Sequence, residues 1–149
     1  MSPKTAALLT RINAVGFALF ALFWAGAAFP GLDGPARFLL DLLDWPLDGT
    51  PGALDQYARW LSAIGAGLTA AFATMSWLVV APAIERGDVT ARNGALAAIT
   101  VWFLADSAGS IASGVAPNAA FNAVFFGLYA APLLAMRPFR AAGDQAAKG

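Results

Sequence analysis

Four long apolar runs constrain this sequence more than any other feature. They cover residues 12–32, 57–84, 93–113 and 118–136. A helix needs about 20 mostly apolar residues to cross a bilayer, and each run has about that length or more. The runs are continuous, whereas the strands of a membrane barrel alternate between apolar and polar residues. Because lipid offers the backbone no hydrogen-bond partner, the sequence predicts an all-α fold, an integral membrane bundle of four transmembrane helices.

The composition supports this prediction and excludes other classes. Of the 149 residues, 59% are apolar and 12% are charged, against about 45–50% and about a quarter in ordinary soluble domains. A soluble fold of this composition would expose large apolar patches to water. Nine basic and nine acidic residues cancel, so no positive charge is left over for binding nucleic acid. We expect one membrane domain, residues 1–149, with the lipid bilayer as its main partner.

The sequence contains neither cysteine nor histidine. This excludes disulfides, thiol catalysis, Cys/His zinc sites and catalytic triads that use histidine. No pair of carboxylates falls within the apolar runs, and there is no phosphate-binding or dinucleotide-binding motif. We therefore expect no metal, no cofactor and no catalytic residues, which disfavours a membrane enzyme.

Lysine and arginine are distributed unevenly around the four runs. Seven of the nine fall before the first run, between the second and third, or after the fourth: Lys4, Arg11, Arg86, Arg92, Arg137, Arg140 and Lys148. The other side of the membrane would hold only Arg37 and Arg59. The positive-inside rule then predicts that both termini lie in the cytoplasm. A cleaved signal peptide is the alternative for the first run, which is long for that purpose.

The loop after the first run contains a further helical pattern at residues 35–44, with the sequence PARFLLDLLD. Pro35 suits a first helical turn, and Arg37 and Asp41 have the i,i+4 spacing of an ion pair. Asp41, Asp44 and Asp48 recur on one side. The pattern predicts a short amphipathic helix in the first outer loop, with carboxylates facing water. It would act as a lid on the bundle or as a recognition helix for a partner. Residues 141–149 are predicted to form a disordered tail.

One ionised residue lies well inside an apolar run. Asp106 is about seven residues from the outer end of the third run, so roughly 10 Å deep. Ser110 follows one turn later on the same face. Asn118 and Asn122 lie near the outer end of the fourth run, and the short turn between the runs should bring Asn122 within reach of Asp106. Arg59, at the outer end of the second run, has a side chain long enough to bend toward the same level.

This polar intramembrane cluster allows two interpretations. The five side chains can be a buried hydrogen-bonded group that holds the bundle together. They can instead line a water-accessible pocket in which Asp106 binds a proton or a cationic ligand, because an intramembrane carboxylate is by default a functional candidate.

Several segments resemble a widespread family of small, uncharacterised four-span bacterial membrane proteins. They are Trp45-Pro46-Leu47-Asp48-Gly49, Arg59-Trp60-Leu61-Ser62-Ala63, and residues 102–114 followed by Pro117-Asn118 and Asn122. The resemblance covers most of the chain from the outer loop onward. It implies a bacterial inner-membrane location and brings no activity.

Two functions remain in competition. The first is a non-catalytic accessory subunit or a bundle that binds lipid or a small molecule. The alternative is a small proton- or cation-coupled transporter that works through Asp106. This transporter would be an oligomer, because four helices enclose little pore. A homo-oligomer and a larger membrane complex are both open as states of assembly.

Overall fold

A computed structural model of the chain describes residues 1–49 and 52–137. Over these residues the secondary structure is helical, without strands. Four helical segments are long and apolar enough to cross a membrane: Pro3–Ala28, Gln56–Glu85, Val89–Ala112 and Pro117–Ala135. The all-helical prediction is confirmed for the described residues, and the four segments suggest a multi-pass membrane protein. The tail predicted at residues 141–149 lies outside the described residues.

The first span begins well before the apolar run that predicted it. Helix α1 covers Pro3–Ala25 and continues as a 3₁₀ turn, η1, over Gly26–Ala28. Ser2 caps α1, because its hydroxyl accepts a hydrogen bond from the Thr5 N–H at 3.2 Å. Arg11 is accommodated inside the helix by an ion pair with Glu85 at 2.8 Å. A cap and an ion pair need no lipid, so α1 extends beyond its apolar part.

The second span contains three segments. Helix α3 covers Gln56–Met75, a π-helical turn, η2, covers Ser76–Val80, and α4 covers Ala81–Glu85. Proline at position 82 has no N–H to donate to the preceding turn, and such a gap in the hydrogen-bond ladder favours a local widening of the helix.

The third and fourth spans form an antiparallel hairpin. Helix α5 covers Val89–Ala112 and α6 covers Pro117–Ala135. Gly114 connects them with a φ of 86°, a backbone conformation that glycine adopts without steric cost. Pro117 begins α6 in the position where a missing N–H is harmless.

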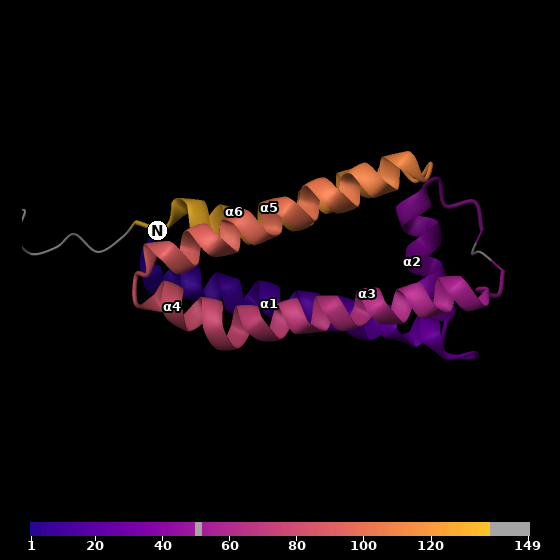
Figure 1. Ribbon diagram of the computed structural model, residues 1–149, viewed down its shortest axis with the longest axis horizontal. Helices are drawn as coiled ribbons and strands as arrows, with labels where there is room; N and C mark the ends of the chain where they lie inside the picture. Colours follow the sequence, from indigo (N-terminus) through magenta and orange to yellow (C-terminus); the bar gives the residue numbers. More distant parts are fainter. Residues whose placement is uncertain (50–51, 138–149) are drawn as a thin grey trace, which may run out of the picture.

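Helix α2, Gly34–Asp44, lies crosswise to the four spans (Figure 1). It contacts α1 and η1 at one side of the bundle and α6 at the other. The expected pair between Arg37 and Asp41 does not form: Arg37 instead approaches Asp33 at 3.8 Å. Asp41 is buried, contrary to the expectation that its carboxylate faces water, and accepts a hydrogen bond from the Gly49 N–H at 3.3 Å.

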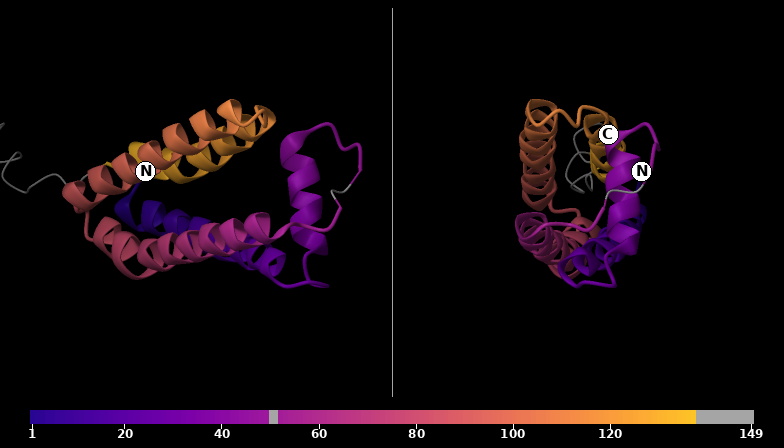
Figure 2. Two further views of the ribbon diagram at one scale, coloured as in Figure 1. Left: turned by 45° about the vertical axis from the view of Figure 1, so that its right-hand side comes forward. Right: turned by 90° about the vertical axis from the view of Figure 1, so that its right-hand side faces the viewer.

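The four spans are arranged as two pairs. Helices α1 and α3 pack along each other, and so do α5 and α6. The pairs meet at the end formed by the start of α1, by α4 and by the end of α6, which we call the closed end. They diverge toward the other end, which we call the α2 end, as both Figure 1 and Figure 2 show. No Cα atom of α3 comes within 8 Å of a Cα atom of α5 or α6, and all three helices lie within the described residues.

The core lies in the half of the bundle nearest the closed end. The Phe17 ring of α1 contacts Phe72 of α3 at 5.4 Å between centroids and Phe125 and Tyr129 of α6 at 5.7 and 6.0 Å. Ile84, Ile99, Leu133 and several alanines complete this cluster. Small residues allow helices to approach closely, and aromatic rings fill the remaining space.

Candidate functional site

Asp106 lies on the face of α5 that points between the two helix pairs. It follows Ile99 by seven residues, so the two side chains share one helix face. Ile99 is 1% exposed within the core. Two turns closer to the α2 end, the partly buried Asp106 has no hydrogen bond or ion pair with any described residue. Its carboxylate is therefore available to bind a proton, a cation or a hydrogen-bond donor.

Asp106 and Asn122 do not form the predicted contact, because Asn122 bonds a different residue of α5. The Asn122 amide donates to Ser107 at 3.3 Å, and the Asn118 amide donates to Ser110 at 2.8 Å. Successive residues of a helix point 100° apart, so Ser107 faces α6 while Asp106 points to the side of it. The structure brings four predicted residues of the cluster to the same hairpin, but only three of them form hydrogen bonds: Asn118 pairs with Ser110, and Asn122 pairs with Ser107, which was not predicted.

Arg59 forms no ion pair with Asp106. It lies seven residues before Ala66 and fourteen before Ala73, so these three residues share a face of α3. Ala73 lines a groove of about 290 Å³ with residues of α1, among them Ala14 and Ala18. Both ion pairs recorded for the described residues, Arg11–Glu85 and Arg37–Asp33, lie elsewhere. The guanidinium of Arg59 is therefore not part of the same site.

Three helices show the same change in burial as the pairs separate. On α3, Leu68 and Leu61 share a face with the core residue Phe72, yet they are 68% and 60% exposed. On α1, Phe17 is 8% exposed, and Trp24, seven residues later, is only half buried. On α5, Ile99 is followed by Asp106. We call Trp24, Leu61, Leu68 and Asp106 the inter-pair residues, because each continues a core face into the region where the pairs have parted.

A buried hydroxyl pair was not predicted from the sequence. Ser76 and Tyr129 are each 1% exposed, and their oxygen atoms are 2.9 Å apart. This hydrogen bond joins η2 to α6 at the centre of the core. The signal was available, because both residues are polar interruptions of apolar runs, but neither is charged and the pairing depends on helix rotation.

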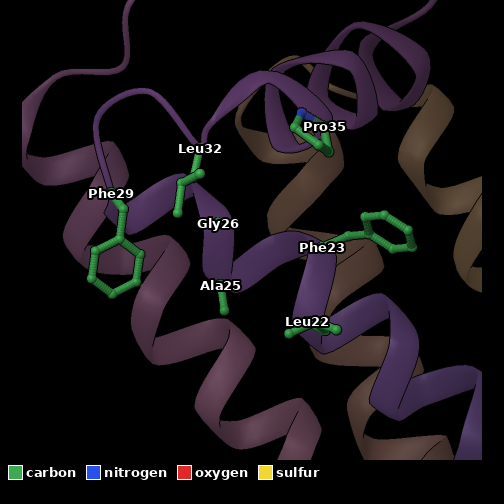
Figure 3. A pocket seen from close by; sticks show the side chains of 7 residues that line it. All are labelled: Leu22, Phe23, Ala25, Gly26, Phe29, Leu32 and Pro35. Carbon is green, nitrogen blue, oxygen red and sulfur yellow. The ribbon is translucent and has the colours of Figure 1, made fainter.

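An apolar pocket of about 300 Å³ lies where α1, η1 and α2 meet (Figure 3). Its lining includes Leu22, Phe23, Phe29 and Leu32, and it contains no charged side chain. Leu22 lies five residues after Phe17, so it points away from the core face of α1. The pocket is therefore separate from the inter-pair residues and offers only an apolar surface.

Comparisons of the chain with protein-family models, with curated proteins and with solved structures give no match.

Proposed function

We propose that this chain is a multi-pass protein of the bacterial inner membrane and that it works as a non-catalytic bundle. In this proposal it holds a lipid or a similar small amphiphile between its two helix pairs, alone or as an accessory subunit of a larger complex. One observation carries the proposal: the apolar core face of α3 continues, exposed at Leu61 and Leu68, toward the end where the pairs separate. The family resemblance supports the inner-membrane location.

The distribution of basic residues supports an orientation with both termini in the cytoplasm. Arg11, Arg86, Arg92 and Arg137 lie toward the closed end, and Arg137 donates its backbone N–H to the Met1 carbonyl at 3.0 Å. The α2 end is then periplasmic. A cysteine introduced at Ser2 should resist a membrane-impermeant thiol reagent in intact cells, and one at Asp48 should react. The reverse pattern would invert the orientation.

Quenching by brominated phospholipids tests whether lipid occupies the region between the pairs. One variant keeps Trp24 and replaces the other four tryptophans by phenylalanine; the matched control keeps Trp60, which is 61% exposed. After reconstitution into brominated vesicles, we expect both variants to be quenched to a similar extent, because bromine must contact the indole. Quenching of Trp60 with protection of Trp24 would mean that protein closes the region, and the proposal would fail.

The alternative is a proton- or cation-coupled transporter that works as an oligomer through Asp106. The observation in its favour is that the Asp106 carboxylate has no partner among the described residues. Transport predicts that vesicles containing the protein dissipate an imposed pH gradient faster than empty vesicles, and that Asp106→Asn abolishes the difference. Equal rates in the two kinds of vesicle would contradict a proton carrier and leave the binding function.

A further inference from the structure

The inter-pair residues around Asp106 differ in chemistry from an ordinary lipid-facing surface. On three helices, the residue seven positions from the aromatic cluster toward the α2 end lies about 10 Å farther along its helix. These three residues are therefore at the same depth in the bundle. Counted from Phe17, Phe72 and Tyr129, they are Trp24, Gly65 and Asn122. Trp24 lies against Gly65, since a Cβ atom at Gly65 would be 3.4 Å from the indole nitrogen. Asn122 bonds Ser107, the neighbour of Asp106. The carboxylate and the indole therefore occupy the same level.

Aromatic rings continue from Trp24 toward α6. The Phe20 ring stacks on Trp24 with centroids 6.1 Å apart and an angle of 9°, and it contacts Phe125 at 5.5 Å. Trp102 lies on α5 one turn before Asp106 and packs against the core. Aromatic faces carry negative electrostatic potential and attract cations, most strongly when the cation is desolvated.

The protein supplies no cation of its own at this level among the described residues. The basic residues of the α2 end are Arg37 and Arg59: Arg37 approaches Asp33 just before α2, and Arg59 lies on the face of α3 that it shares with Ala66 and Ala73. An ionised carboxylate inside a membrane is costly unless a positive charge or hydrogen-bond donors compensate it. A carboxylate at the level of several aromatic rings, without a partner among the described residues, is complementary to an ammonium group.

The position also determines how such a ligand would enter. Asp106 lies six residues before Ala112, the last residue of α5, so it is about 9 Å from that end of the helix. No Cα atom of α3 lies within 8 Å of one of α5, so a ligand that enters between these helices would come sideways from the bilayer. Leu61 and Leu68, both largely exposed, offer an apolar wall along this path. A ligand that fits has a cationic head and an apolar chain.

We propose that the inter-pair residues bind an amphiphilic ammonium compound, with its head group paired to the Asp106 carboxylate beside Trp24 and its chain along Leu61 and Leu68. This inference rests on the proposed binding function and specifies the class of ligand.

Matched amphiphiles test the head group. The protein, purified in dodecyl maltoside, is titrated with dodecylammonium and with dodecanol, which has the same chain and a neutral head, and binding is measured as the rise in thermal unfolding temperature. We expect the native protein to bind dodecylammonium at least about tenfold more tightly than dodecanol, which corresponds to about 1.4 kcal/mol. Asp106→Asn should remove this preference, and Asp44→Asn, at an exposed acid of α2, should keep it.

A second variant keeps the proposal testable if Asp106→Asn does not fold. Helical side chains lean toward the N-terminus of their helix. A lysine at position 68 of α3 would therefore lean toward the α2 end, and Asp106 leans toward the closed end, so the two should meet. Leu68→Lys should lose the preference for dodecylammonium while Leu68→Met retains it.

The outcomes separate the two proposals. Equal binding of dodecanol and dodecylammonium by the native protein would refute the ammonium site but leave the bundle as a binder of apolar chains. A preference that survives both Asp106→Asn and Leu68→Lys would place the ammonium elsewhere and would also refute the inference. If neither dodecylammonium nor dodecanol raised the unfolding temperature of the native protein or of any variant, the proposed function itself would be refuted.

Discussion

The hydrogen bond between Ser76 and Tyr129 gives the sharpest test of the core. Both side chains are 1% exposed and their oxygens are 2.9 Å apart, so each variant that removes one oxygen leaves the other hydroxyl without its partner. Ser76→Ala strands the phenol of Tyr129, which cannot reach a carbonyl of its own helix. We expect this variant to lose about 2 kcal/mol of unfolding free energy, within the range for an unsatisfied buried group.

Tyr129→Phe should cost less, about 1 kcal/mol. The serine left behind can donate its hydroxyl to the backbone carbonyl four residues earlier in its helix, as serine and threonine often do. The double variant leaves no hydroxyl without a partner and should lose about 1.5 kcal/mol, little more than Tyr129→Phe alone. The coupling energy of the cycle should then be about 1.5 kcal/mol, close to the largest value of about 1.7 kcal/mol measured between membrane helices, where the average is about 0.6 kcal/mol.

Reversible unfolding by sodium dodecyl sulfate in mixed micelles, followed by circular dichroism, measures these energies. Thr74→Val is the matched control, because the exposed Thr74 hydroxyl bonds only the Ala70 carbonyl of its own helix, at 2.9 Å; it should change stability by less than about 0.5 kcal/mol. Single variants whose effects add within about 0.3 kcal/mol would refute the argument, since additivity would mean that the two hydroxyls do not interact.

Two further predictions concern the ends of helices. Gly26→Ala should destabilise the fold by about 1–3 kcal/mol, because its Cβ atom would lie 2.8 Å from the Leu32 carbonyl oxygen. Gly16→Ala, which meets nothing within 4 Å, should stabilise α1 by about 0.5–1 kcal/mol; equal unfolding temperatures for the two would contradict this. Asp88→Ala removes the cap on the Ala91 N–H, 3.0 Å from the carboxylate, and should cost about 1 kcal/mol in the same assay; an unchanged temperature would mean that the cap is dispensable.

The number and approximate position of the long helices could be predicted because apolar run length is a strong signal. The start of α1 could not, because the helix continues into a segment that contains Lys4 and Arg11. There it depends on the Ser2 cap and on the contact with Glu85. Glu85 is far away in sequence, so nothing local to α1 reveals this contact.

At the candidate site, the depth of the residues could be predicted from the sequence, but the directions of their side chains could not. The short turn at Gly114 predicted which residues of α5 and α6 lie at the same depth, and Asn122 does bond a residue next to Asp106. Depth follows from counting residues along a helix, but the direction of a side chain depends on how the helix is rotated. A shift of one residue rotates the side chain by 100°, enough to exchange Ser107 for Asp106. The rotation of α5 depends on contacts such as the packing of its Phe103 ring against Phe126 of α6, which the sequence alone does not reveal.

The π turn at Ser76–Val80 has a consequence for how this sequence can change over evolution. The Ala81 N–H donates to the carbonyl of Ser76, five residues back, so this turn contains one residue more than an α-helical turn spans. Deleting a single residue here, for example the largely exposed Val79, would restore an ordinary α-helix. It would leave the direction of α4 almost unchanged, because the π turn already absorbs the extra residue, and the fully buried Ile84 would stay in the core. Homologous sequences should therefore tolerate the loss of one residue between Ser76 and Ile84, whereas a deletion within α3 would rotate the rest of the span by about 100°.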